Sequence, residues 1–174
     1  QTKINLLRYF FDDEEVFSRV LVFGRSRKNV ENIRKSLEGK TRGVVRVLHA
    51  NKGQNTRINA IEAFKEGEVR ILVATDVAAR GIDVANLSHV INFNLPDDVE
   101  TYTHRIGRTG RAGKDGVAHS FFTRNDKMLA GCLVHVLKEA GQEVPKEMLK
   151  FDLRIRGSTV NKVFNKDGAS EAPR

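Results

Sequence analysis

The chain has 174 residues, of which 40% are hydrophobic and 30% charged, and its formal net charge is +8. This composition is typical of one folded domain, and a single cysteine excludes a disulfide framework and a cysteine-rich zinc site. No apolar run is long enough to span a membrane, and the N-terminal residues lack the pattern of a secretory signal. Because the chain begins with Gln1, we expect it to be a piece of a longer protein.

Apolar runs alternate with amphipathic segments along the chain. We expect a short entry helix within residues 1–19, and strands at 19–24, 44–50, 69–75, 88–94 and 116–123. Helices are expected after Ser26, around Ile58 to Phe64, over 99–106 and over about 128–137, with Gly39, Gly67 and Gly141 as stops. This alternation predicts an α/β fold: a parallel sheet with helices on both faces, in which the strand at 69–75 is buried on both sides. We expect one domain over residues 1–150 and a partly flexible extension over 151–174.

Positive charge is concentrated in one part of the chain. Residues 25–57 contain ten Lys and Arg but only two acidic residues, Glu31 and Glu38, which accounts for the whole net charge of +8. The pattern is equally typical of solvated helix faces, as at Arg34, Lys35 and Lys40, and of a surface that binds phosphate.

Three polar segments directly follow predicted strands: GRSRK (24–28), HANKGQNTR (49–57) and ATDVAARGID (74–83). Ligands of parallel sheets bind beyond the carboxyl ends of the strands. Small residues let a phosphate approach main-chain N–H groups, and arginine supplies charge in a planar fork. Since none of the three segments contains an aromatic residue, we expect contacts with sugar and phosphate rather than with stacked bases.

A fourth segment, HRIGRTGRAG (104–113), is rich in arginine. His104, Arg108 and Arg111 are spaced i, i+4, i+7, so they would share one helical face if the helix persisted. Such a cluster suits a transferring phosphoryl group, and the alternative is a solvated basic turn. The chain contains neither G-x-x-x-x-G-K-[ST] nor G-x-G-x-x-G, so a nucleoside triphosphate would be held mainly by another domain.

The four segments resemble motifs of the C-terminal RecA-like domain of DEAD-box RNA helicases. ATDVAARGID is similar to the family's motif V, HRIGRTGR to motif VI, VLVFGRSRK to motif IV and Gln54-x-x-Arg57 to its QxxR element. The motifs come in the family's order over about residues 19–123, and Ala50 departs from the family's usual Gly. The resemblance implies a RecA-like three-layer sandwich with at least five parallel strands, the second lobe of a two-lobe ATP-dependent RNA helicase.

The resemblance also implies roles for individual residues. Four of them would contact the RNA sugar-phosphate backbone: Arg57, Thr75, Arg80 and Gly81. Asp83 would hydrogen-bond the ATP ribose, and two catalytic arginine fingers would reach the γ-phosphate: Arg108 and Arg111. Four residues would couple the lobe to its N-terminal partner: His104, Arg105, Asp76 and Gln54. ATP and Mg²⁺ would be held mainly by that partner, and we expect no metal site in this lobe.

An enzyme of this family would unwind RNA duplexes locally or remodel ribonucleoprotein, whereas the lobe alone would be inactive. The segment from Phe121 to Pro145 resembles eukaryotic members that act in ribosome assembly. We therefore expect an intracellular, membrane-free monomer, nuclear or nucleolar if that likeness holds and otherwise cytoplasmic. Its partners would be RNA and the N-terminal RecA-like domain of the same protein.

Two alternatives remain. One is a catalytically inert RNA-binding or protein-docking module, which would not need Asp83, Arg108 and Arg111. The other is a DNA-directed translocating helicase, for which an aromatic wedge or an extended hairpin would be expected. We interpret His89, His119 and His135 as structural, and Cys132 and the Met and Leu residues of the last helix as core.

Overall fold

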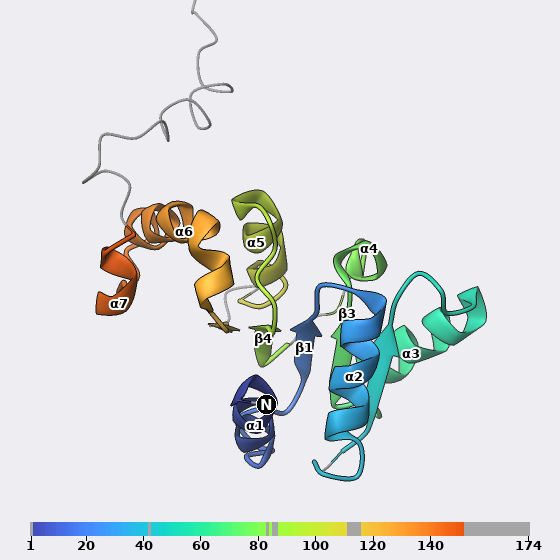
Figure 1. Cartoon of the computed structure of the whole chain (residues 1–174). Helices are drawn as coiled ribbons and strands as arrows, with labels where there is room; N and C mark the ends of the chain where they lie inside the picture. The colour runs from blue at the N-terminus through green and yellow to red at the C-terminus, as the bar shows by residue number, and fades with distance from the viewer. Residues whose placement is uncertain (1, 42, 83, 85–86, 111–115, 152–174) are drawn as a thin grey trace, which may run out of the picture. The chain divides into compact units, whose positions relative to one another are not determined.

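The computed structural model describes residues 2–41, 43–82, 84, 87–110 and 116–151 (Figure 1). Its contacts divide the chain into two compact units, residues 1–122 and residues 123–174. The described part of the first unit contains, in chain order, α1 (Thr2–Phe11), β1 (Val20–Phe23), α2 (Arg27–Leu37), β2 (Val45–Leu48), α3 (Gln54–Glu66), β3 (Ile71–Ala74), α4 (Asp76–Ala79), β4 (His89–Asn92), α5 (Val99–Ile106) and β5 (Val117–Ser120).

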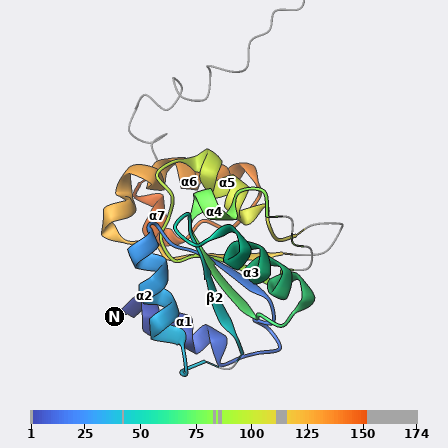
Figure 2. The ribbon, with the colours of Figure 1, turned by 90° about the vertical axis from the view of Figure 1, so that its right-hand side faces the viewer.

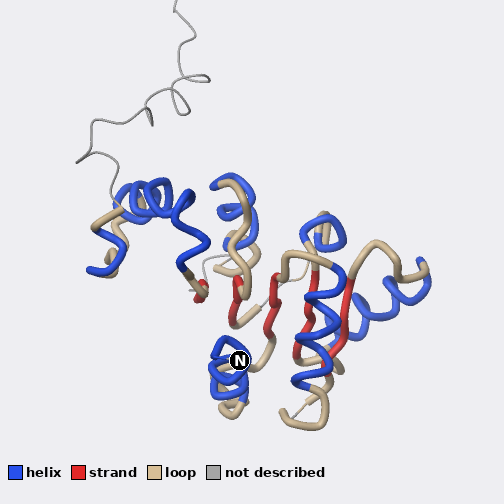
Figure 3. The backbone as a smooth tube through the Cα atoms, viewed as in Figure 1, coloured by secondary structure: helices blue, strands red, loops and turns tan. Residues whose placement is uncertain are grey.

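The five strands form one parallel sheet in the order β2-β3-β1-β4-β5, as the side-by-side strands of Figure 3 show. Each strand is four residues long, shorter than the apolar run that predicted it. The predicted parallel sheet flanked by helices is therefore confirmed.

The helices begin and end where local chemistry sets their limits. The Ser26 side chain accepts a hydrogen bond from the Asn29 N–H at the start of α2, and the Asp98 side chain accepts one from the Thr101 N–H at the start of α5. At the end of α3, Gly67 takes the left-handed conformation with φ +88°. The predicted cap at Ser26 and the predicted stop at Gly67 are both confirmed.

Hydrophobic side chains fill both faces of the sheet. Along β3, Ile71 and Val73 pack into a cluster with α1 and α2, whereas Leu72 and Ala74 pack into a second cluster with α3 and α4. Figure 2 shows α1 and α2 on one side of the strands and α3 on the other. The prediction that the third strand is buried on both faces is confirmed.

The apolar residues of α3 do not all face the core. Ile58 is 40% exposed, whereas Phe64 and Ala60 are buried and Ile61 is partly buried. Ala60 and Phe64 are four residues apart and share one helix face, while Ile58 lies two residues from Ala60 and so points to the opposite side. The helix predicted around Ile58 to Phe64 is present as α3, but Ile58 does not share the buried face of Ala60 and Phe64.

The second unit contains η1 (Arg124–Asp126), α6 (Lys127–Glu139) and α7 (Lys146–Leu149) within its described residues. The predicted last helix is present as α6, which buries Leu129, Leu133 and Val134. The prediction that Met128 is a core residue was wrong, because it is 92% exposed. Cys132, also predicted as core, is only half-buried. The expected extension over 151–174 lies almost wholly outside the described residues and stays a prediction. None of the helices in the described part of the chain is both long and apolar enough to cross a bilayer.

Candidate functional site

The polar segments that follow β1, β2 and β3 meet at the carboxyl edge of the sheet. The Gly24 N–H donates to the Ala74 carbonyl (3.0 Å), and the Thr75 N–H donates to the Leu48 carbonyl (3.2 Å). The Arg25 N–H donates to the side-chain oxygen of Asn94, just past the end of β4 (3.3 Å). The expected gathering of these segments at one edge is therefore confirmed.

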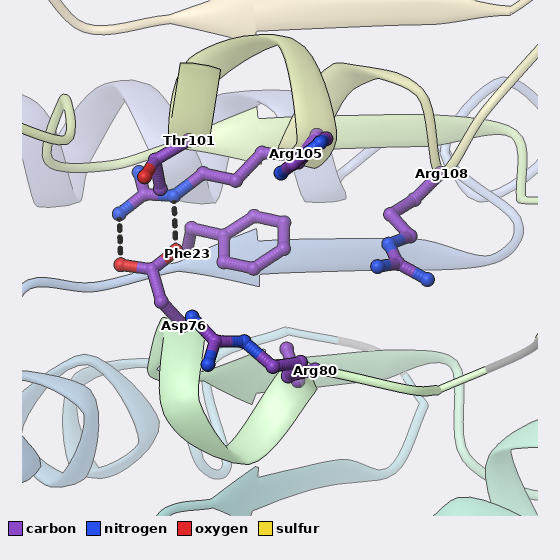
Figure 4. A pocket seen from close by; sticks show the side chains of 8 residues that line it. Phe23, Asp76, Arg80, Thr101, Arg105 and Arg108 are labelled. Atoms are coloured by element: carbon purple, nitrogen blue, oxygen red, sulfur yellow. Dashed lines mark hydrogen bonds and ion pairs between the residues drawn. The ribbon is translucent and has the colours of Figure 1, made fainter. Parts of the chain in front are cut away.

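A pocket lies at this edge between α4 and the segment formed by α5 and the turn after it (Figure 4). We call it the arginine pocket; it is lined by Phe23, Asp76, Ala79, Arg80, Thr101, His104, Arg105 and Arg108. Five of these eight residues were predicted as site residues from the sequence: Asp76, Arg80, His104, Arg105 and Arg108. The fold thus brings parts of the 74–83 and 104–113 segments together.

Arg105 is the most constrained of the pocket arginines, with only 3% of it exposed. Its Nε and Nη2 atoms donate to the two carboxylate oxygens of Asp76, at 2.6 and 2.7 Å (Figure 4). Its Nη1 donates to the Asn92 side chain (3.0 Å) and to the Asn94 carbonyl (2.7 Å), and its guanidinium lies 4.8 Å from the Phe23 ring centre. A bidentate, hydrogen-bonded pair of this kind holds α4 and α5 together. The interdomain role expected of Arg105 and Asp76 stays a prediction, because the observed contacts lie within the lobe.

Arg108 lies beyond α5, which ends at Ile106. Its Nη1 donates to the Ile82 carbonyl at 2.9 Å, and its backbone N–H closes a turn onto the Arg105 carbonyl. The shared helical face of His104, Arg108 and Arg111 was conditional on a continuing helix, and this condition is not met because α5 ends before Arg108. Gly107 ends the helix, so Arg108 reaches the pocket from a turn.

The chain closes tightly on both sides of the undescribed segment 111–115. A Cβ atom added at Gly116 would clash with the backbone of Gly110, which itself has φ +67°. This close approach explains why the turn after Arg108 needs glycines. Arg111 lies outside the described residues, as does Asp83.

The remaining residues expected to contact RNA lie around α3 and α4. Thr75 is the N-cap of α4 but makes no side-chain cap bond, and Arg80 is exposed. Gly81 has φ +77°, a conformation that favours glycine, and the space beside it is open. Main-chain groups at this position are thus accessible to a ligand.

Gln54 and Arg57 form the first turn of α3. The Arg57 Nη1 donates to the Gln54 side-chain oxygen at 3.4 Å, and the Arg57 Nε is buried without a hydrogen-bond partner in the described structure. The Gln54-x-x-Arg57 pair predicted from the sequence is thus formed, and most of the Arg57 guanidinium is left uncommitted.

Glu31 on α2 neutralises part of the basic stretch. Its carboxylate lies 2.9 Å from Lys52 Nζ, 3.1 Å from His49 Nε2 and 3.3 Å from Arg34 Nε. Hydrogen bonds from Lys52, and then from His49 and Arg34, lower the pKa of Glu31 to about 2 against the opposing effect of burial. Arg34, whose side chain is 24% exposed, also pairs with Glu38 (2.7 Å) and so belongs to an ion-pair network on the surface of α2.

Two further contacts were not anticipated from the sequence. Asn92 is fully buried in β4, where its side chain accepts from Arg105 and donates to the Ser120 hydroxyl (3.1 Å). A polar residue within the apolar run SHVINFN was the available signal. Glu31 gave a weaker signal, as one of only two acidic residues in the basic stretch.

Comparison with known proteins places the chain in a family. Residues 2–113 match the model of the helicase conserved C-terminal domain. The chain belongs to that family. This C-terminal RecA-like domain is 44% identical to the "DEAD-box ATP-dependent RNA helicase 5" of Arabidopsis thaliana, over all of the chain and 32% of the relative.

Solved structures support the same assignment of this helicase domain. The E. coli DEAD-box protein SrmB is 37% identical, with a TM-score of 0.71 over 84% of this chain and 85% of that chain. S. cerevisiae Dbp5, solved bound to RNA and ADP BeF3, is 29% identical, with a TM-score of 0.67 over 89% of this chain and 41% of that chain. The helicase domain spans about a third of the length of the curated relatives that it matches.

Proposed function

We propose that this domain is the second lobe of an ATP-dependent RNA helicase and that the arginine pocket completes an ATP site built mainly by another lobe. The observation that carries the proposal is the charge balance of the pocket. Its one carboxylate among the described residues, Asp76, is bound on both oxygens by Arg105, so Arg80 and Arg108 remain to attract an anion. The membership in the helicase C-terminal family supports the same function.

The size of the pocket supports a shared site. Its volume is about 80 Å³, whereas sites that enclose a small molecule have roughly 300–1,000 Å³. The pocket is thus large enough for a phosphate group but not for a whole nucleotide. Arg108 would stabilise charge on the γ-phosphate as an arginine finger. Two residues outside the described part of the chain would act with it: Arg111 on the same phosphate and Asp83 on the ribose.

The residues of the pocket fit the phosphates of ATP but do not fit Mg²⁺. Mg²⁺ prefers oxygen ligands in octahedral geometry, and the Asp76 oxygens are committed to Arg105. The described residues contain no cluster of three or more His, Cys, Asp or Glu side chains that could bind a metal ion. We therefore propose that Mg²⁺ is held by the partner lobe and not by residues of this one.

RNA would bind along the same edge of the sheet through its backbone. Arg57 and Arg80 would pair with phosphates, while the Thr75 hydroxyl and the main chain at Gly81 would hydrogen-bond to sugar or phosphate. His104 and Gln54 would couple these contacts to the N-terminal lobe. Because ATP and RNA would each bind tightly only when the lobes close, each would favour binding of the other, and hydrolysis would release both.

An inert RNA-binding or docking module is the competing function. A chimeric two-lobe protein, in which this chain replaces the matching residues of the Arabidopsis relative, distinguishes the helicase from the inert module. We expect this chimera to hydrolyse ATP in the presence of RNA, and the chain alone to bind RNA weakly and hydrolyse no ATP. A folded chimera that binds RNA without hydrolysis would favour the inert module, and substantial hydrolysis by the chain alone would contradict a shared site.

The monomeric state, the role in ribosome assembly and the nuclear or nucleolar location also stay proposals. A sedimentation experiment on the chain tests the first of them. Localisation of the tagged protein in cells tests the last.

A further inference from the structure

Glu31 connects α2 to the turn that precedes α3. One carboxylate oxygen contacts both His49 Nε2 and Lys52 Nζ, which are the two ends of this turn. The Lys52 N–H donates to the His49 carbonyl at 3.0 Å and closes the turn. A single negative charge thus holds both ends of the turn against a helix of the core.

The turn determines where α3 begins. Gly53 is the N-cap of α3 and has no side chain to cap it, and the Arg57 N–H donates to the Gly53 carbonyl at 3.0 Å. The orientation of the first turn of α3 therefore depends on the residues just before Gly53. Gln54 and Arg57 lie on that first turn.

His49 gives the contact a specific chemical requirement. Only 6% of its side chain is exposed, and its Nδ1 has no hydrogen-bond partner in the described structure. Glu31 is the partner of the other ring nitrogen, so that nitrogen must carry a proton to donate. Replacing the carboxylate by the amide of glutamine removes the negative charge and leaves one acceptor oxygen for three donors, those of His49, Lys52 and Arg34.

We infer that Glu31 is a positioning residue for RNA binding, which acts by fixing the turn 49–52 and thereby the Arg57 guanidinium. This inference rests on the proposed contact between Arg57 and RNA. Glu31 itself touches only protein groups and is not expected to contact RNA.

Because Glu31 is negatively charged, the direction of the change in RNA affinity on its removal tests the inference. Removing one negative charge raises the net charge of the chain, and simple attraction of the RNA polyanion would then become stronger. Loss of positioning predicts the opposite result, weaker RNA binding. Glu38 provides a matched control, because it lies just past the end of the same helix, is 63% exposed in its side chain and contacts Arg34 rather than the turn.

The experiment measures the affinity of the 174-residue chain for a short single-stranded RNA at low ionic strength. We expect Glu31→Gln to weaken binding by about three- to tenfold, and Glu38→Gln to leave it unchanged or slightly tighter. Because Glu31 would act through Arg57, Glu31→Gln should have little further effect in an Arg57→Ala background. Glu31→Asp keeps the charge but shortens the side chain, so we expect weakening similar to that of Glu31→Gln.

The outcomes separate the two levels of the proposal. If Arg57→Ala weakens binding but Glu31→Gln and Glu31→Asp do not, the positioning role is wrong and the RNA contact stands. If Arg57→Ala has no effect, the proposed RNA contact itself fails. If Glu31→Gln weakens RNA binding equally in the wild-type and Arg57→Ala backgrounds, Glu31 does not act through Arg57. If Glu31→Gln does not fold, the RNA affinity of Glu31→Asp provides the test instead.

Discussion

Arg105 and Arg57 belong to the same edge of the sheet but differ in what remains free for a ligand. Arg105 is 3% exposed and donates to Asp76, Asn92 and the Asn94 carbonyl. Arg57 is half-buried and, among the residues that the structure describes, its side chain has one hydrogen bond, at 3.4 Å to Gln54. The comparison shows that one motif arginine can be fully committed within the lobe while another keeps free donors, and that burial and hydrogen bonding distinguish the two.

The carboxylates of the two regions have the same kind of partner. Asp76 in the arginine pocket and Glu31 beside the 49–57 segment each bind basic side chains of the lobe. Arginines with unused donors remain in each region, Arg80 and Arg108 in the arginine pocket and Arg57 beside the 49–57 segment. The lobe thus uses its few carboxylates at this edge to organise it, and presents the remaining positive charge.

The largest effect is expected from removing the ion pair between Arg105 and Asp76. Arg105→Ala would leave the Asp76 carboxylate without its bidentate partner, and loss of one member of a buried pair costs about 3–5 kcal/mol. Because Asp76 is partly exposed, we expect the lower end, about 3 kcal/mol of unfolding free energy, measured by urea denaturation. Arg108→Ala is the control and should cost about 1 kcal/mol, the value of one hydrogen bond. Equal losses of unfolding free energy in the two variants would contradict a structural role that is specific to Arg105.

A smaller stability effect is expected at Glu31. Its pKa is lowered to about 2, chiefly by hydrogen bonding to Lys52. Since the pKa is lower in the folded state, this stabilisation is complete above about pH 4.5 and is lost as the pH falls toward 2. Allowing for its partial exposure, we expect Glu31→Gln to lose about 2 kcal/mol at pH 6 and almost nothing at pH 2. A difference between the two proteins that did not depend on pH would contradict this ion-pair network.

The RNA contact of Arg57 should appear in the salt dependence of binding. Each phosphate contact to a single strand contributes about 0.7 to the slope of log K against log salt concentration. Arg57→Ala should lower the magnitude of the slope by about this amount. Lys35→Ala removes the same charge from an exposed position of α2 and should change the slope less. The same reduction in both variants would indicate general attraction rather than a contact.

The smallest effect is expected at two histidines of the sheet, of which His89 is buried and His119 half-buried. His89 and His119 stack with ring centres 5.4 Å apart, and burial lowers the pKa of both. Since the folded state binds these protons less readily than the unfolded state, stability is complete above about pH 6.5 and decreases as the pH falls below it. His89→Phe should make the melting temperature less sensitive to pH between 7.5 and 5. An unchanged pH dependence would exclude a contribution from His89.

The sequence predicted the parallel sheet and its edge because apolar runs and caps act locally. Ser26 and Gly67 act through their own neighbours in the chain, and both predictions are confirmed. The resemblance named Asp76, His104 and Arg108 as site residues, but it did not predict that they line one pocket. The commitment of Arg105 could not be predicted, because it depends on Asn92 and Phe23 from two other strands. The position of Arg108 past the helix depends on where Gly107 ends it, which spacing alone does not determine.

The division of labour between Arg108 and Arg57 is tested most directly in the two-lobe chimera, by measuring RNA-stimulated ATP turnover and RNA affinity for each alanine variant. We predict that Arg108→Ala lowers turnover at saturating RNA by on the order of 10³-fold while RNA affinity changes by less than about threefold. Arg57→Ala should weaken RNA binding and leave turnover at saturating RNA nearly intact. If Arg108→Ala weakens RNA binding as much as it slows turnover, or Arg57→Ala abolishes turnover at saturating RNA, the assignment of one arginine to ATP and the other to RNA is wrong.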